Sequence, residues 1–240
     1  MDTDKPVKLN PRLKAVARLV IPGEPVADIG SDHGYLPIYL VSRGIVPSAV
    51  AVEVSPGPWA RADRQVRLYG MEGEIQVRLG DGLQPIRPGE VATAVLAGMG
   101  TQTIIRILAE AGPVVRSLKR LVLQPMVEVP LLRKWLYEQG LHLTQEELVQ
   151  EGHRYYVVLA AEKGIKPMPS AMELELGPLL MANKHPLLKE YMLQVLRQDE
   201  ALLAELKQFD SEKALRQRQL LEKRLKEWKE VMRWLFPAEP

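Results

Sequence analysis

The sequence predicts an α/β fold in which a mostly parallel sheet closes in an antiparallel hairpin and is followed by a helical hairpin. Short apolar runs alternate with helix-like segments between about residues 26 and 139, which is typical of parallel strands joined by crossover helices. Two strand-like runs, 141–151 and 154–162, are joined only by the Gly152-His153 turn, which indicates an antiparallel pair. Beyond residue 166 the composition shifts to Leu, Glu, Lys, Arg and Gln, as in long amphipathic helices.

Local signals define the elements in chain order. Asn10 and Pro11 predict the start of a first helix, because asparagine caps helices and proline suits the first helical position. Beyond it, apolar and often β-branched runs that end at a glycine or a polar turn are expected to be strands, and the segments that follow those turns to be helices. The expected strands are 26–29, 49–54, 75–79, 91–97 and 121–123, and the expected helices between them are 35–41, 56–70, 103–111 and 129–139.

The C-terminal part is expected to be a separate helical domain. Residues 163–170 hold a glycine and two prolines and indicate a linker, so we expect domains at 1–165 and 166–240. Two long helices should follow, separated by a turn at 209–211, with Asp199 and Arg218 interrupting their apolar faces. Such faces are expected to pack on each other as an antiparallel, coiled-coil-like hairpin. The expected apolar positions are Met192, Val195, Leu202, Leu206, Phe209, Ala214, Leu221, Leu225, Trp228, Met232 and Leu235.

Composition excludes several kinds of site. The 240 residues include no cysteine, which excludes disulfides, a thiolate nucleophile and sulfur-based zinc sites, and we expect no metal. The N-terminus has no apolar leader, and no apolar stretch reaches the ~18 residues of a membrane span. We therefore expect a cytoplasmic protein that needs no membrane.

The loop from Asp28 to Gly34, Asp-Ile-Gly-Ser-Asp-His-Gly, is the first candidate site. A turn between the first strand and its helix cradles nucleotide cofactors in this kind of fold, because glycine lets the backbone approach closely. Asp32 stands where a dinucleotide fingerprint has its middle glycine. Asp28 suits the ammonium group of S-adenosylmethionine and would repel a diphosphate. The loop therefore favours S-adenosylmethionine, the alternative being an ordinary turn that contains Gly30.

Two further acids follow the next two strands. Glu53 lies 19 residues beyond Gly34, where an acid accepts hydrogen bonds from ribose hydroxyls; Val54 adjoins it. Asp81, next to Gly82, could accept from the adenine amine while Leu83 packs on the ring. Each acid alone could be a solvated strand end or an Asp-Gly turn. Three acids at three successive strand ends indicate a cofactor cleft.

The candidate transfer site is the Ala97-Gly98-Met99-Gly100 segment at the end of the fourth strand. Methyltransferases of exocyclic amines carry an Asp or Asn followed by two prolines and an aromatic residue, and this tetrapeptide is absent. The acceptor is therefore expected to be a ring nitrogen with an available lone pair. Transfer to such an atom is an in-line displacement that alignment can promote, so we expect His33 and Tyr35, beside Met99, to position the acceptor. A local hydrogen-bonding role is the alternative for His33.

These segments together resemble one family. The resemblance rests on DIGSDHGYLPIYL, VEVSPGPWARA, VRLGDGL, LAGMG, LVLQP and EGHRYY, in this order between about Leu13 and Glu162. They are similar to the bacterial tRNA adenine-N1 methyltransferases that modify adenine 22. The resemblance implies a Rossmann-like class I methyltransferase fold, and 1-methyladenosine as the product. Thr101, where a second glycine is expected, and Ser55-Pro56 depart from the family pattern. The resemblance implies that S-adenosylmethionine is surrounded by Asp28, Gly30, Asp32, His33, Glu53, Asp81, Gly82, Gly98, Met99 and Gly100.

Two basic regions are candidates for tRNA contact. Between residues 213 and 233 eight basic residues face three acidic ones, a net charge of +5 against +2 for the whole chain. Phosphate contacts supply most of the affinity for RNA, whereas one alternative is a solvated helix face. Another is self-association, or binding of a protein partner, through the side that carries Trp228, Met232 and Trp234; we expect a monomer or a weak homodimer. The N-terminal candidates are Lys5, Lys8, Arg12, Lys14 and Arg18, and the helical ones that we single out are Arg216, Lys223, Arg224 and Lys226.

The sequence is compatible with three other functions. An NAD-dependent dehydrogenase would need the glycine-rich diphosphate turn that Asp32 interrupts. A non-catalytic RNA-binding adaptor would have no use for the complete set of three acids. A methyltransferase that acts on a small molecule or a protein is also compatible with the cofactor residues, since only the basic regions favour RNA.

Overall fold

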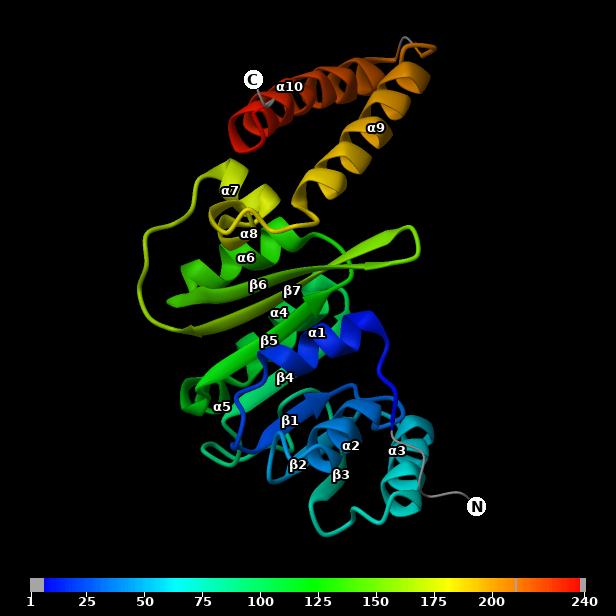
Figure 1. Ribbon diagram of the computed structural model, residues 1–240, viewed down its shortest axis with the longest axis vertical. Coiled ribbons are helices and arrows are strands. Elements are labelled where there is room, and N and C mark those ends of the chain that lie inside the picture. The colour runs from blue at the N-terminus through cyan, green and yellow to red at the C-terminus, as the bar shows by residue number, and fades with distance from the viewer. Residues whose placement is uncertain (1–6, 210, 238–240) are drawn as a thin grey trace. The chain divides into compact units, whose positions relative to one another are not determined.

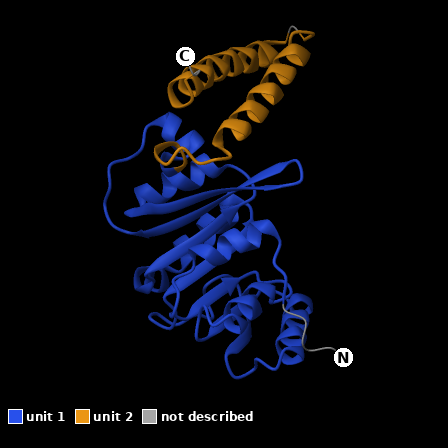
Figure 2. Cartoon of the chain, in the orientation of Figure 1, with its two compact units in different colours: residues 1–179 blue, residues 180–240 orange. Residues whose placement is uncertain are grey.

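The computed structural model describes residues 7–209 and 211–237. The chain forms two compact units, Met1–Leu179 and Leu180–Pro240 (Figure 2). Lys5, a candidate RNA contact, and Asp210, within the expected 209–211 turn, lie outside the described residues. Among the helices of the described ranges, none combines the length and the apolar character that crossing a membrane requires.

The first unit is built on a seven-stranded sheet with the order β3-β2-β1-β4-β5-β7-β6 (Figure 1). The first five strands are parallel, and β7 runs antiparallel to both β5 and β6. This confirms the predicted fold class and the closing hairpin. The strands are β1 Val26–Ile29, β2 Ala49–Glu53, β3 Ile75–Leu79, β4 Thr93–Met99, β5 Arg120–Pro125, β6 Leu141–Glu151 and β7 Arg154–Lys163.

The strand order contains a switch point between β1 and β4. From β1 the chain moves outward to β2 and β3, and then returns to the other side of β1 as β4. Open α/β sheets bind their ligands at such a point, at the carboxyl ends of the strands, because the connections leave there in opposite directions. The topology thus places the candidate site beyond Ile29 and Met99.

The helices of the first unit cover the two faces of this sheet. A core cluster joins α1 and α2 to Val26, Val95 and Val122 of β1, β4 and β5. The Asn10 side chain accepts from the Leu13 backbone N–H at 2.8 Å, so the predicted cap of α1 is present. The helices are α1 Pro11–Leu19, α2 Tyr35–Ser42, α3 Pro56–Leu68, α4 Thr101–Glu110, α5 Gly112–Ser117, α6 Val129–Glu138 and α7 Ala171–Leu176, followed by α8 Pro178–Ala182, which spans the unit boundary. The sequence did not predict α5, α7 or α8.

A buried ion pair fastens α7 to the sheet. Arg133 of α6 and Glu146 of β6 are both buried, with 2.8 Å between Nε and Oε1. Arg133 Nη1 also donates to the backbone carbonyls of Leu174 and Glu175, at 2.8 and 3.1 Å. Glu146 Oε2 accepts from the Leu179 backbone N–H at 2.7 Å. The first unit therefore continues past the linker-like residues 164–170 as far as Leu179.

The second unit contains the predicted helical hairpin, formed by α9 Leu188–Leu206 and α10 Glu212–Leu235 (Figure 1). Asp199 is buried between the helices, and Arg224 Nε donates to its Oδ2 at 2.7 Å. The expected apolar face of α9 is wrong in part, because Leu196 is buried in place of Val195 while Leu202 and Phe209 are exposed. The pattern was ambiguous there, since Val195-Leu196 and Leu202-Leu203 are adjacent apolar pairs.

Candidate functional site

The topology brings the three acids to one edge of the sheet. Strands β1, β2 and β3 are parallel neighbours, so their carboxyl ends lie side by side. Asp28 is the last residue but one of β1, Glu53 is the last residue of β2, and Asp81 lies two residues after the end of β3. Gly98 and Met99 end β4, on the other side of β1. The residues of the candidate cofactor and transfer sites therefore share one edge.

The loop after β1 is held in a tight conformation by Glu53. Gly30 and Gly34 have positive φ angles of +71° and +68°, and Asp32 adopts +54°. The Asp32 backbone N–H donates to Glu53 Oε1. The φ of Gly30 is one that other residues rarely adopt, and Met99 Cε lies 2.6 Å from where a Cβ on Gly30 would be, so the end of the Met99 side chain packs on the loop. Glu53 thus orients the loop, in addition to the ribose contact expected from the sequence.

Asp28 is a desolvated carboxyl group. Its residue is 5% exposed, and burial raises the pKa of Asp28 to about 7. The Ser31 hydroxyl lowers this pKa in part, and the Glu53 carboxylate raises it. Ser31 Oγ is itself buried and makes no hydrogen bond of standard geometry within the described chain. A buried carboxyl and a buried hydroxyl with unused capacity fit a cationic, hydrogen-bonding ligand such as the methionine ammonium of S-adenosylmethionine.

Asp28 lines a cavity of about 270 Å³. The cavity lies between the N-terminal part of α1, the β1 loop, the start of α2 and the end of β4. Its lining includes Arg12, which the sequence had suggested as an RNA contact. The lining residues are Arg12, Leu13, Asp28, Gly30, Ser31, Asp32, His33, Tyr35, Leu36, Ala97 and Gly98.

The two candidate acceptor-positioning aromatics stack on each other beside this cavity. The rings of His33 and Tyr35 have centroids 5.4 Å apart and an interplanar angle of 21°. His33 Nε2 lies 3.7 Å from the Asp32 carboxylate, and Tyr35 is exposed. The Met99 carbonyl accepts from the Met126 backbone N–H at 2.8 Å, which ties the end of β4 to the loop after β5.

Thr101, the departure from the expected glycine, has a structural role. It is fully buried, and its hydroxyl donates to the Val127 carbonyl at 2.6 Å. The hydroxyl thus links the start of α4 to the loop after β5, which is already tied to the end of β4. Gly100 caps α4 from an extended conformation, with φ −67° and ψ 148°, which a threonine at the next position does not disturb.

The third acid differs from the first. Both Asp81 oxygens accept from Arg106 of α4, at 3.0 and 3.1 Å, and this guanidinium lowers the pKa of Asp81. Leu83 is buried and Val54 is exposed. A Cβ on Gly82 would lie 2.7 Å from Ile107 Cγ2, so α4 packs closely on this turn. An adenine amine would therefore have to compete with Arg106 for Asp81.

Sequence reasoning missed three residues that shape the site. Arg61 of α3 pairs with the Asp32 carboxylate at 2.9 Å, and Arg106 pairs with Asp81. Gln124 of β5 is completely buried, and its Oε1 accepts from the Gly98 backbone N–H at 3.0 Å. Of the three, only Gln124 had a sequence signal, as a polar residue within the apolar LVLQP run.

Apart from Arg12, which lines the cavity, and Lys5, which lies outside the described residues, the candidate RNA contacts fall into two groups. Lys8, Lys14 and Lys226 are exposed, as a phosphate contact requires. Four others have acidic partners in the described chain. Arg18 approaches Glu147 at 3.9 Å, Arg216 pairs with Glu212, Lys223 approaches Glu227 at 3.8 Å, and Arg224 pairs with Asp199.

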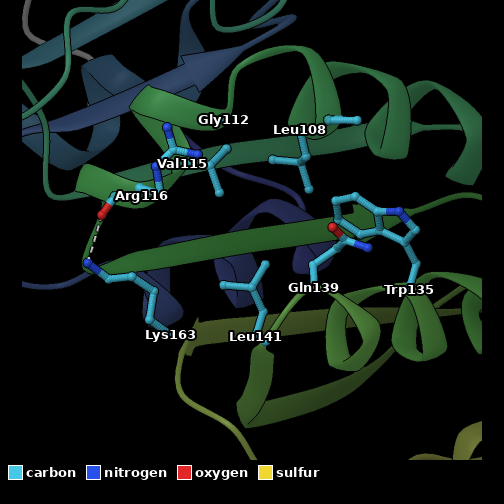
Figure 3. Close-up of a pocket in the computed structure, with 10 residues that line it drawn as sticks. Leu108, Gly112, Val115, Arg116, Trp135, Gln139, Leu141 and Lys163 are labelled. Atoms are coloured by element: carbon cyan, nitrogen blue, oxygen red, sulfur yellow. Dashed lines mark hydrogen bonds between the residues drawn. The ribbon is translucent and has the colours of Figure 1, made fainter.

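A second cavity, of about 320 Å³, lies away from this edge (Figure 3). Leu108 of α4, Trp135 of α6 and Gln139, which follows α6, face it, and Lys163 Nζ donates to the Arg116 carbonyl at 2.8 Å. Lys163 ends β7, and Ala161 of β7 pairs with Leu121 near the start of β5. This cavity is thus at the amino ends of the parallel strands and includes none of the three acids.

Known proteins resemble the chain over nearly its whole length. The family description tRNA (adenine(22)-N(1))-methyltransferase matches residues 26–230. The tRNA (adenine(22)-N(1))-methyltransferase of Bacillus subtilis is 34% identical over 94% of this chain and 98% of its own length. A putative tRNA (m1A22) methyltransferase of Streptococcus pneumoniae, solved with S-adenosyl-L-methionine, is 34% identical with a TM-score of 0.84, covering 94% of this chain and 100% of that one. An M. capricolum protein, solved with S-adenosyl-homocysteine, is 27% identical with a TM-score of 0.80, covering 94% of this chain and 99% of that one. The chain therefore belongs to the tRNA (adenine(22)-N(1))-methyltransferase family, as the resemblance in its sequence motifs predicts.

Proposed function

We propose that this protein transfers the methyl group of S-adenosylmethionine to N1 of adenine 22 in tRNA and forms 1-methyladenosine. The observation that carries the proposal is the match to the family over residues 26–230, in a chain whose three acids lie at one edge of the sheet. We place its work in the cytoplasm, where tRNA is available, with the protein acting as a monomer or a weak homodimer.

The cofactor residues divide by the part of S-adenosylmethionine that each can hold. Asp28 would pair with the ammonium group, since a charged ligand offsets the cost of ionising a buried carboxyl. Glu53 would accept from the ribose hydroxyls, and Asp81 from the adenine amine. Their neighbours would line the cleft by backbone or apolar contact. These neighbours are Gly30, Asp32, His33, Val54, Gly82, Leu83, Ala97, Gly98, Met99 and Gly100.

The chemistry asks for alignment rather than for a strong base. S-adenosylmethionine supplies a methyl group on a cationic sulfur. Adenine N1 has a lone pair in the plane of the ring and carries no proton, so positive charge passes from sulfur to the base and no proton has to leave. His33 and Tyr35, stacked beside the cavity, would hold the adenine plane, with Met99 on the transfer side. Fixing the geometry of two reacting groups is itself a large contribution to rate.

The RNA must expose the target edge before transfer. N1 lies on the Watson–Crick edge, so the base has to be turned out of any helical pairing, at a cost of a few kcal/mol. Phosphate contacts would supply the compensating affinity. We assign these contacts to the exposed Lys8, Lys14 and Lys226, and to Arg216 and Lys223, whose acidic partners lie on the solvent-exposed surface of the same helix. The helical part from residue 166 onward would thus contribute RNA binding, and residues 1–165 the cofactor site together with the RNA contacts of Lys8 and Lys14.

A methyl-transfer assay tests this function directly. Labelled S-adenosylmethionine and unmodified bacterial tRNA are expected to give 1-methyladenosine, measured by nucleoside analysis of the digested product. A transcript that carries guanosine at position 22 is the matched control and should stay unlabelled. Cofactor binding without transfer to tRNA would contradict the RNA assignment and direct attention to other acceptors.

A further inference from the structure

The charge of the cavity beside Asp28 is balanced by Arg12. The methionine part of S-adenosylmethionine carries an ammonium group and a carboxylate on the same carbon, so it needs an anionic and a cationic partner close together. Asp28 offers the anion. Among the described residues that line this cavity, Arg12 is the one side chain with a permanent positive charge.

Arg12 is brought to the cavity by the start of α1. It follows Pro11, the first residue of the helix, and its backbone N–H donates to Glu151 Oε1 at 2.7 Å. Its guanidinium lies over the Tyr156 ring of β7, 5.7 Å from the centroid, in the range of a cation–π contact. Both contacts come from the β6–β7 hairpin, which therefore holds the N-terminal end of α1 against the sheet.

Gln124 fixes the direction of the Arg12 guanidinium. Its Oε1 accepts both from Arg12 Nη1 and from the Gly98 backbone N–H. Its Nε2 donates to the Pro125 carbonyl at 2.8 Å, so the orientation of the amide is determined from both ends. A Cβ on Gly98 would lie 3.4 Å from Arg12 Nη1, so the guanidinium rests on the glycine at the end of β4.

The register of the sheet places the two charges at neighbouring strand ends. Strands β1 and β4 are adjacent, with Asp28 opposite Val95 and Ile29 opposite Leu96. Asp28 thus lies at the end of one strand and the Arg12 guanidinium over the end of the next. Gly98, on which Arg12 rests, lies three residues beyond Val95 along β4. Asp28 and Arg12 both line the same cavity, so one ligand in it can meet an anionic and a cationic partner.

We infer that Arg12 binds the carboxylate of the methionine part of S-adenosylmethionine, and that Gln124 positions it for this contact. The inference rests on the proposed function, since it assumes that this cofactor binds here. A guanidinium presents several N–H donors in a plane and suits a carboxylate. Arg12 is half-buried and held by Gln124 and Tyr156, whereas the lysines assigned to RNA are exposed. A cofactor contact therefore explains its position better than a phosphate contact does.

The test compares two ligands that differ by one group. S-adenosylmethionine and decarboxylated S-adenosylmethionine share the ammonium group, and only the first has the carboxylate. Calorimetric titration of the full-length Arg12→Met variant is expected to show S-adenosylmethionine weakened by about 10- to 100-fold, the range for a hydrogen bond to a charged group. The decarboxylated ligand should bind wild type and variant alike. Arg18→Met is the matched control, because Arg18 lies on the same helix and is exposed, and it should leave both affinities unchanged.

Gln124→Met tests the positioning role. It should weaken S-adenosylmethionine by about 3- to 10-fold, the range for one neutral hydrogen bond, and leave the decarboxylated ligand unaffected. Equal weakening of both ligands in Arg12→Met would overturn the inference, because it would mean that Arg12 only maintains the cavity. Unchanged cofactor binding with weakened tRNA binding would assign Arg12 to phosphate instead. If wild type binds neither ligand, the proposed function itself is wrong, an outcome distinct from a difference confined to the variants.

Discussion

The proposed cofactor cleft has a methionine end at Asp28 and an adenine end at Asp81, and the protein surrounds these two carboxyl groups in opposite ways. At the methionine end, Asp28 is buried without a cationic partner on its own loop, and its pKa is raised to about 7. At the adenine end, Asp81 is partly exposed and paired with Arg106, which lowers its pKa. The first carboxyl holds unsatisfied capacity for a ligand, whereas the second is already satisfied by the protein. We therefore expect most of the discrimination for the cofactor to come from the methionine end.

The largest expected effect is that of Asp28→Asn. Loss of the charged partner for the ammonium group should weaken S-adenosylmethionine by about 100-fold, toward the upper range for a charged hydrogen bond. The matched Asp81→Asn variant should lose about threefold, because Asp81 must release Arg106 before it can bind. Calorimetric titration measures both, with circular dichroism as the control for folding. A larger loss in Asp81→Asn than in Asp28→Asn would reverse the comparison.

The next effect is on the pH dependence of cofactor binding. In the proposed complex the ionised form of Asp28 binds the ammonium group, and burial raises the pKa of Asp28 in the free protein to about 7. Affinity for S-adenosylmethionine should therefore rise roughly tenfold between pH 6 and pH 8, as expected for one linked proton. Titrations at a series of pH values measure this change. The Asp28→Asn variant should show a flat profile over the same range, and a wild-type profile without slope would contradict the raised pKa of Asp28.

A smaller effect concerns the stability of the cofactor-free protein. The pKa of Asp28 is raised above its ordinary value in the folded protein, so protonated Asp28 favours the folded state. This contribution to the free energy of unfolding is fully present below pH 4 and is lost as the pH rises through about 7. Asp28→Asn should therefore melt higher than wild type at pH 8 without cofactor, by roughly 2–8 °C if about 1–2 kcal/mol is recovered. The difference should shrink toward pH 5. Melting curves at the two pH values decide this, and a less stable variant at pH 8 would contradict the assignment of a desolvated charge.

The smallest effect is expected for Arg106→Ala. Removing the guanidinium frees Asp81 for the adenine amine, and exposed ion pairs are weak. Affinity for S-adenosylmethionine should rise by roughly two- to fivefold, and its measurement needs only the same titration. Arg61→Ala, which removes the partner of Asp32 rather than of Asp81, serves as the comparison. A loss of affinity in Arg106→Ala would show that Arg106 itself contacts the cofactor.

The strands and the acids at their ends were predictable for a shared reason. Buried parallel strands are short apolar runs, and the polar residues that end them stand out in the sequence. Helix α7 also had a signal, since Ser170 and Glu173 form a capping box, but its surroundings read as a linker. Arg61 and Arg106 had none, because an arginine on a helix surface looks the same whether its partner is water or a loop far away in the sequence. Arg12 shows the same limit, since its position beside basic neighbours suggested RNA while the fold places it in a cavity.

The buried pair of Arg133 and Glu146 affects how the protein folds during synthesis and where the chain can be truncated. Both residues leave the ribosome before Leu174, Glu175 and Leu179, whose backbone groups complete their hydrogen bonding. Until those residues arrive, two desolvated charges would lack part of their compensation, so this corner of the sheet should close late during synthesis. In a recombinant fragment that ends at residue 165 the two charges would never gain these hydrogen bonds. A fragment intended to retain the sheet should therefore extend at least to Leu179.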